Sequence, residues 1–247
     1  VDNTIAASVN RSSVEANNLT ILATDDTNVD VEARAAAVAV AAGIGAALSG
    51  GGALANIDAT STVRAEITGV GEANVIDVAG TVTVKATNKS NLDAEVQVLS
   101  VSLGLVGLAA SGSIAKINTR PAGNNKSVQA NVGGVDLDAG TLRIDALSLI
   151  GTKANVEGIT VASTAAVGVS EAEIKTGANV GMQVGNSLGD INVGFLDATA
   201  GSDGNPIGSL IADATAKASG GGLLIGVNST NVVVDNTDTV VASVGDD

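Results

Sequence analysis

The stretch at residues 142–146 reads LRIDA, and its alternation of apolar and charged side chains indicates the fold class. In a β-strand, successive side chains point to opposite faces. Leu142, Ile144 and Ala146 would therefore share one face, and Arg143 and Asp145 would lie on the other. An apolar stripe at helical spacing is absent, and Val, Ile and Thr dominate such stretches along the chain. We therefore predict an all-β protein.

The same alternating pattern recurs along the chain, usually just after a glycine-containing turn. Its copies are LTILA at 19–23, VTVKA at 82–86, LRIDA at 142–146 and LIADA at 210–214. The turns that precede the last three are expected at 79–80, 139–140 and 207–208. The regular return of one pattern predicts a repeat.

Two further markers define the length of this repeat. One is an alternating stretch, found as IAASV at 5–9, VRAEI at 63–67, VQANV at 128–132, VGMQV at 180–184 and VVASV at 240–244. Its copies start 58, 65, 52 and 60 residues apart. The other precedes it as Ile57-Asp58, Ile117-Asn118, Ile174-Lys175 and Val234-Asp235, and Val1-Asp2 fits it too. We predict one repetitive β array with repeats at 1–56, 57–116, 117–173 and 174–233 and a partial repeat at 234–247.

The two ends of the sequence share a phase of this repeat. The letters VDNT occur at 1–4 and again at 234–237, and ASV follows in both places. We therefore expect the chain to be a cut from a longer array.

The composition limits how such repeats can pack. The 247 residues include no Cys, His, Trp or Tyr, one Phe (Phe195), one Met (Met182) and 31 Gly. Aromatic residues usually dominate core energetics, so a core without them needs closely spaced layers of Ala, Val, Ile and Leu. Glycine permits both tight turns and close backbone approach.

These features predict an elongated parallel β-solenoid, or β-helix, of about 60-residue repeats. A rung of about 20 residues would give roughly three rungs in each repeat. The alternative is a row of antiparallel β-sandwich modules of the same length. The distinguishing feature is that a solenoid makes contacts between neighbouring rungs only.

Long uncharged segments also recur, at 35–57, 96–115 and 158–169. The first is long enough to span a bilayer, but it is mostly Ala and Gly, and the last is too short. We interpret them as a buried strand pair in each repeat, with no membrane span. The parity change near Leu99-Ser100 predicts a bulge or corner. Turns are expected at 49–52, 121–125, 201–206 and 219–222, where Gly, Asn, Asp and both prolines cluster.

The charge excludes some partners. Twelve basic residues stand against 26 acidic ones, for a net charge of −14. Nucleic-acid binding needs a basic stripe, and anionic lipid surfaces attract basic segments, so both partners are disfavoured.

With these residues in view, the chain resembles the repeat regions of giant bacterial surface proteins, the filamentous haemagglutinin-like and leukotoxin-like filamentous adhesins. The resemblance rests on DVAGTVTVKA at 77–86 and on the Ala/Val/Gly run at 35–57, and it extends over nearly the whole chain. It implies a secreted, elongated β-solenoid at the bacterial cell surface, and it offers no catalytic motif.

The residues give few candidates for a chemical site. Without His, Cys or Tyr, the usual catalytic bases and nucleophile activators are missing, so we predict no catalytic and no cofactor-binding residue. Structural calcium is the one metal considered, with oxygen ligands from Asp25, Asp26 and Asp30 or from Asp235 and Asp238. Asp25 and Asp26 are neighbours and would point to opposite faces of a strand.

The prediction for function is a stalk or filament segment of an extracellular or cell-surface adhesin that associates end to end or continues in a longer chain. The alternative is an adhesive module that binds carbohydrate or another host ligand. Carbohydrate sites usually use aromatic platforms, and here only Phe195 is available.

Overall fold

The computed structural model describes residues 1–71, 73–121, 127–185, 188–202 and 212–245, and all regular elements in these ranges are β-strands. The strands are β1 (Asp2–Asn10), β2 (Val14–Ala16), β3 (Leu19–Val40), β4 (Ala46–Asp58), β5 (Thr60–Thr68), β6 (Val75–Leu103), β7 (Val106–Asn118), β8 (Val128–Gly133), β9 (Asp136–Ala162), β10 (Ala165–Thr176), β11 (Asn179–Val184), β12 (Ile191–Ser202), β13 (Ala212–Gly222), β14 (Ile225–Asn236) and β15 (Thr239–Val244). The prediction of an all-β chain is confirmed.

The strands form three sheets, and each described pairing is parallel. One sheet has the order β1-β5-β8-β11-β15, a second β14-β10-β7-β4, and a third β12-β9-β6-β2 with β3 beside β6 and β13 beside β9. The antiparallel pairing of the sandwich alternative does not occur among these strands.

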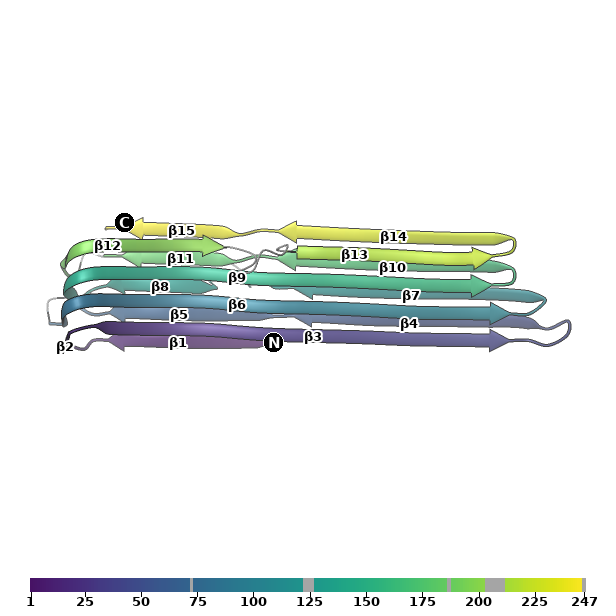
Figure 1. The fold of residues 1–247 in the computed structure, drawn as a ribbon, viewed down its shortest axis with the longest axis horizontal. Helices are drawn as coiled ribbons and strands as arrows, with labels where there is room; N and C mark the ends of the chain where they lie inside the picture. Colours follow the sequence, from purple (N-terminus) through teal and green to yellow (C-terminus); the bar gives the residue numbers. More distant parts are fainter. Residues whose placement is uncertain (72, 122–126, 186–187, 203–211, 246–247) are drawn as a thin grey trace.

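The three sheets make two layers (Figure 1). The chain runs along the long strands β3, β6 and β9 in one layer, reverses at a tight turn, and returns through two shorter strands in the other layer. The return strands pack against the long ones, β7 against β6 and β9 for example. The long axis of the molecule follows the strands, because β6 alone has 29 residues.

The register confirms the first and third sequence markers and three of the four copies of the second, since Leu19, Val82 and Leu142 share one row. The first marker aligns Ile5, Val63, Val128, Val180 and Val240 in one row across five strands. The third marker aligns Ile57, Ile117, Ile174 and Val234. The chain thus returns to the same row once in 52 to 65 residues. The prediction of three rungs per repeat is wrong, because one circuit with a long strand uses a whole repeat.

Two marker assignments were wrong. Leu142 pairs with Leu196, in a second alternating stretch of the fourth repeat, LDATA at 196–200, whereas Ala214 of the expected copy pairs with Ala154. Leu210 and the turn expected at 207–208 lie outside the described residues. The pair Val1-Asp2 also does not join the third marker, since Asp2 pairs with Thr60, beyond Ile57.

Glycines mark the corner that precedes the second marker. The β6–β9 register shifts between Val78 and Thr81, so the strands bend there. A Cβ on Gly140 would lie 3.0 Å from the carbonyl oxygen of Gly80, and a Cβ on Gly194 would lie 2.8 Å from that of Gly140. The glycines predicted at 80 and 140 therefore stand where only glycine fits, and Gly194 is their continuation.

The turns at the opposite end differ from those expected. Residues 49–52 lie inside β4 and 219–222 inside β13, and the chain reverses instead at 41–45 and 223–224. Nor is there a bulge at Leu99-Ser100, because the register between β6 and β9 continues unchanged from Thr81 to Ser102. Pro121 precedes a segment at 122–126 that, like 203–211 with Pro206, lies outside the described residues.

Two apolar cores fill the space between the layers. One contains Val63, Val84, Val128 and Ile144, and the other Leu92, Val96, Ile117 and Ile174. The cores consist of Ala, Val, Ile and Leu with a single Met, as the composition predicts. Small side chains allow the layers to approach closely, which leaves little internal space.

Candidate functional surfaces

A row of polar side chains separates the two cores. Asp25 on β3 points into it and is 4% exposed. Its carboxylate accepts hydrogen bonds from Asn3 Nδ2 at 3.2 Å, from Thr27 Oγ1 at 2.8 Å and from Ser61 Oγ. Burial of a carboxylate is costly unless such donors replace water. Asp25 therefore ties β1, β3 and β5 together.

The other calcium candidates do not join Asp25. Asp26 points outward and pairs with Lys89 Nζ at 3.5 Å. Asp30 also points outward, beside Asp93 on β6. The opposite orientations of Asp25 and Asp26 are those predicted from the sequence.

The second calcium pair is also divided. An oxygen of Asp235 lies 2.6 Å from Arg120 Nη2. Asp238 instead accepts the Ala178 N–H at 2.8 Å and the Ser202 hydroxyl at 2.6 Å. Across the described parts of the chain, no three acidic residues gather at a point suited to a metal ion.

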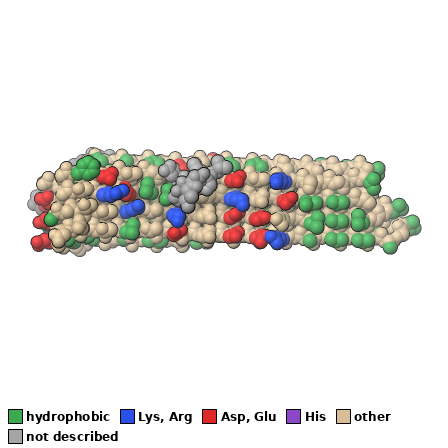
Figure 2. All heavy atoms as spheres, in the orientation of Figure 1, with side chains coloured by type: hydrophobic (Ala, Val, Ile, Leu, Met, Phe, Trp, Pro, Cys, Tyr) green, Lys and Arg blue, Asp and Glu red, His purple; other side chains and the backbone are tan. Residues whose placement is uncertain are grey.

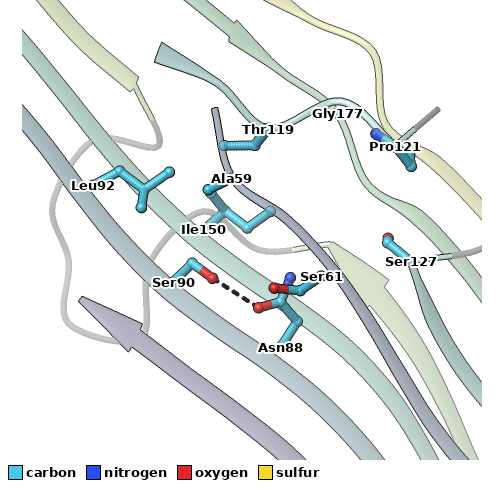
Figure 3. A pocket seen from close by; sticks show the side chains of 10 residues that line it. All are labelled: Ala59, Ser61, Asn88, Ser90, Leu92, Thr119, Pro121, Ser127, Ile150 and Gly177. Atoms are coloured by element: carbon cyan, nitrogen blue, oxygen red, sulfur yellow. Dashed lines mark hydrogen bonds between the residues drawn. The ribbon is translucent and has the colours of Figure 1, made fainter. Parts of the chain in front are cut away.

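A small cavity lies in the polar row beside β6 and β9 (Figure 3). Its lining includes Ser90, whose hydroxyl donates to Asn88 Oδ1 at 2.8 Å, together with Thr119 and Ser127. The volume is about 10 Å³. That is roughly the space of one water molecule, far below the several hundred Å³ of a substrate pocket.

Four carboxylate and ammonium groups form an ion cluster on the outer face of β7 and β10. Lys116 Nζ lies 3.0 Å from Glu173 and 3.2 Å from Glu171, and Lys175 also pairs with Glu173. The hydrogen bonds from Lys175 and then Lys116 hold the pKa of Glu173 below its usual value. Those to Glu173 and Glu171 raise the pKa of Lys116.

The strand ends next to the reversing turns form a second surface, which we call the distal zone and define as residues 35–57, 98–115, 158–170 and 218–234. The zone contains no Asp, Glu, Lys or Arg. Figure 2 shows the consequence on one face, where the right-hand end carries apolar side chains without red or blue atoms. Charge is thus confined to the rest of the molecule, the proximal part.

The distal zone also inverts the usual distribution of side chains. Ser100 and Ser102 are fully buried between the layers, whereas Leu99 and Leu103 beside them point outward and are 39% and 46% exposed. The sequence interpretation of a buried strand pair is therefore wrong for half of these side chains. The parity change at Leu99-Ser100 is the signal, and it marks this inversion and not a bulge.

A shallow hollow of about 370 Å³ lies on the outer face where the distal zone begins. One side is the row Arg34, Gln97 and Glu157, and the other is the row Ala36, Leu99 and Ile159. This polar row continues to Lys217 on β13, which pairs in register with Glu157, and Arg34 also forms an ion pair with Glu32.

Phe195, the candidate platform for a carbohydrate, lies on β12 away from this hollow and is 63% exposed. It is the only aromatic residue of the chain. The hollow is therefore lined without an aromatic ring.

Among the strands that the structure describes, those at both ends of the stacked circuits are paired on one side only. β1 and β15 are the two edges of one sheet, and β4 and β14 are the edges of another. An edge strand offers free N–H and C=O groups to a further strand. Among the described residues there is no helix long and apolar enough to cross a membrane.

No protein-family model, curated protein or solved structure matches the chain.

Proposed function

We propose that the chain is a structural segment of an extracellular bacterial surface adhesin, in which its circuits form a β-solenoid that continues end to end. The next circuit comes from a further copy or from the same chain. The segment serves as stalk or filament body and has no catalytic role. The resemblance to filamentous adhesins and the acidic, cysteine-free composition support the cell-surface location.

The observation that carries the proposal is the equivalence of β1 and β15. Ala7, Ala65, Ala130, Met182 and Ala242 form one row across the sheet that these strands terminate. Ser8-Val9 and Ser243-Val244 follow in the same register. A strand like β1 can therefore add to β15 by the parallel pairing that joins each earlier circuit. Such a contact is heterologous and propagates without closing.

The filament axis would run along the direction in which the strands stack, perpendicular to the strands themselves. Strands in a sheet lie about 4.8 Å apart, so each added copy whose β1 pairs with the preceding β15 lengthens this five-stranded sheet by about 24 Å. The width is set by the long strand, about 95 Å for the 29 residues of β6. Electron microscopy should therefore show flat ribbons, and diffraction from aligned ribbons should show a reflection near 4.8 Å along the ribbon axis.

A single substitution can block growth at one edge. The N–H groups of Thr239 and Gly245 donate to Ala178 and Val184, at the two ends of β11. Along β15, the N–H groups of odd-numbered residues therefore point toward β11. Those of even-numbered residues, including Ala242, point toward the free edge. Ala242→Pro removes that donor and places a ring at the edge while it leaves the β11 bonds intact. Ala242→Val, which keeps the N–H, is the matched control.

The expected result is ribbons for the wild type and Ala242→Val, and single particles for Ala242→Pro. Single particles for all three at millimolar concentration would contradict assembly between copies. Ribbons for all three would show that β15 is not the growing edge.

A further inference from the structure

The outer surface of the distal zone is apolar on both broad faces. On the long-strand face the outward rows hold Val38, Val40, Leu99, Leu103, Ile159 and Val161. On the opposite face, Leu48 stands beside Leu108, and Val167 beside Val227. The turns between the faces add Ile44, Leu105 and Leu224, which are 94%, 68% and 79% exposed. Apolar side chains therefore surround this end on three sides.

The interior of the same zone combines buried hydroxyl groups with small apolar side chains, among them Ala109, Ala162 and Ala166. Ser111 Oγ and Thr160 Oγ1 lie 2.5 Å apart between the layers, and Ser102 donates to the carbonyl oxygen of Ala47 at 2.7 Å. In water, a slip of one residue would place Val101 or Leu103 at the position of Ser102, and Ile159 or Val161 at that of Thr160, and so bury the larger side chains. The register instead continues unchanged from the proximal part, where apolar residues point inward. A zone with large apolar side chains outside and hydroxyl groups inside is favoured by apolar surroundings over water.

From these features we infer that the distal zone inserts into the hydrocarbon of a zwitterionic phospholipid membrane. A second copy packed sheet against sheet would cover one broad face and leave the turns exposed. Lipid acyl chains cover both faces and the turns at once. Partitioning of apolar side chains into lipid is favourable by the same effect that forms protein cores.

The depth of the zone corresponds to one leaflet. Outward apolar residues extend on β3 from Ala36 to Val40, five residues or about 17 Å. The hydrocarbon core of a bilayer is about 30 Å thick, so one leaflet is about 15 Å. The charged row that contains Arg34 would halt the insertion at the headgroups, so the zone enters the membrane without crossing it.

The hollow at the boundary provides charge complementarity. Arg34 and Glu157 flank it, with Gln97 between them. A phosphocholine headgroup carries a phosphate and a quaternary ammonium, and the row offers both cations (Arg34 and Lys217) and an anion (Glu157). With a net charge of −14, the protein would be repelled by an anionic surface. A zwitterionic lipid is therefore the lipid class that fits.

The inference rests on the proposed function in one respect. Unpaired backbone groups in hydrocarbon are costly, and the edges of β3, β4, β13 and β14 would expose them. A further circuit covers these edges where its strands pair with them as well as with β15. Insertion is therefore a property of the assembled array.

The absence of Trp and Tyr makes a direct test simple. Leu105→Trp places a fluorophore in a reversing turn, and Thr83→Trp places one on the outward proximal face of β6. Ribbons of each variant are mixed with phosphatidylcholine vesicles whose acyl chains are brominated, since bromine quenches tryptophan on contact. We expect at least fivefold quenching for Leu105→Trp and little for Thr83→Trp.

Flotation of ribbons with unlabelled phosphatidylcholine vesicles gives an independent measurement. Val101→Asp, which adds a charge in the distal zone, should reduce the floating fraction at least tenfold, and the matched Thr83→Asp on the same strand should not. Circular dichroism checks that both variants remain folded.

The outcomes separate the two proposals. Ribbons that neither float nor show quenching would overturn insertion and leave the proposed function intact. Lateral pairing of copies without lipid, lost in Val101→Asp, would overturn it in favour of a protein interface. Flotation of single particles, with no ribbons formed, would support insertion and refute end-to-end assembly.

Discussion

Ser170 on β10 joins the two layers of the distal zone, since its hydroxyl donates to the backbone carbonyl of Lys217 on β13 at 2.8 Å. The same hydroxyl lies 2.9 Å from that of Ser113 on β7, and both side chains are fully buried. The three groups form a polar link inside a thin slab. Links of this kind hold together the part of the molecule in which large apolar side chains point outward.

Ser170→Ala should therefore lower the free energy of unfolding by about 1–3 kcal/mol, because the buried Ser113 hydroxyl and the part-buried Lys217 carbonyl would lose their partner. Ser8→Ala, at an exposed position on β1, is the matched control and should change it by less than about 0.5 kcal/mol. Urea unfolding monitored by circular dichroism measures both. Equal effects would show that the internal hydroxyl link does not stabilise the distal zone.

The recurrence of residues along the sequence predicted the strand pairing, whereas the alternation of apolar and polar residues did not predict the strand lengths. Rows such as Val63, Val128 and Val180 were predictable, because an identical residue recurs at an identical phase. The circuit length was misjudged, because alternation tells which face a residue occupies and not where a strand ends. The strand β6 therefore proved longer than a whole predicted rung.

The distal zone could not be predicted from the same rules. The sequence rule assigns apolar residues to the interior, and Leu99 and Leu103 break it while the backbone register stays regular. Glycine likewise predicted turns at 49–52, where the structure has a strand. There a Cβ on Gly51 would lie 3.2 Å from Val98 Cγ1, so the glycine reflects close layers and not a turn.

Substitution of Asp25 tests whether the polar row between the two cores stabilises the fold. Asp25→Ala would leave the Asn3 amide and the Thr27 and Ser61 hydroxyls without their shared acceptor. We expect a loss of about 2–4 kcal/mol in the free energy of unfolding. Asp26→Ala removes the adjacent carboxylate, which is exposed and pairs only across 3.5 Å with Lys89.

The control should therefore change stability by less than about 1 kcal/mol, as is usual for an exposed ion pair. Thermal unfolding of the two variants under identical conditions provides the comparison. If Asp26→Ala were as damaging as Asp25→Ala, the inward orientation of Asp25 would be wrong.

Substitution of Gly134 tests the close backbone packing at the corner of the proximal part. Its φ is +68°, and a Cβ there would lie 2.5 Å from the carbonyl oxygen of Gly69. Both the left-handed backbone and the contact oppose a side chain, so Gly134→Ala should cost about 2–4 kcal/mol. Gly50→Ala on β4 is the matched control, since its Cβ would meet no atom within 4 Å. Chemical denaturation of the two variants should differ accordingly, and similar midpoints would exclude the close stacking of Gly69 and Gly134.

The last prediction concerns pH and the ion cluster around Glu173. Hydrogen bonds from Lys175 and Lys116 lower the pKa of Glu173 from its ordinary value of 4.5. A carboxyl whose pKa is lower in the folded state stabilises the fold fully above the unfolded value. That contribution disappears as the pH falls below about 4.5 and through the folded pKa.

Glu173→Gln should therefore be less stable than the wild type at pH 7, by no more than about 1 kcal/mol because the lysines are partly exposed. The difference should shrink as the pH falls toward 2, where the wild-type carboxyl is also neutral. Urea unfolding at pH 7, 5, 3.5 and 2.5 measures it, and other carboxyls cancel because both proteins contain them. In a Lys116→Met background the pH-dependent difference should be smaller, since one of the two ammonium donors is gone. A difference that stayed constant between pH 7 and 2.5 would show that Glu173 does not stabilise the fold through its charge.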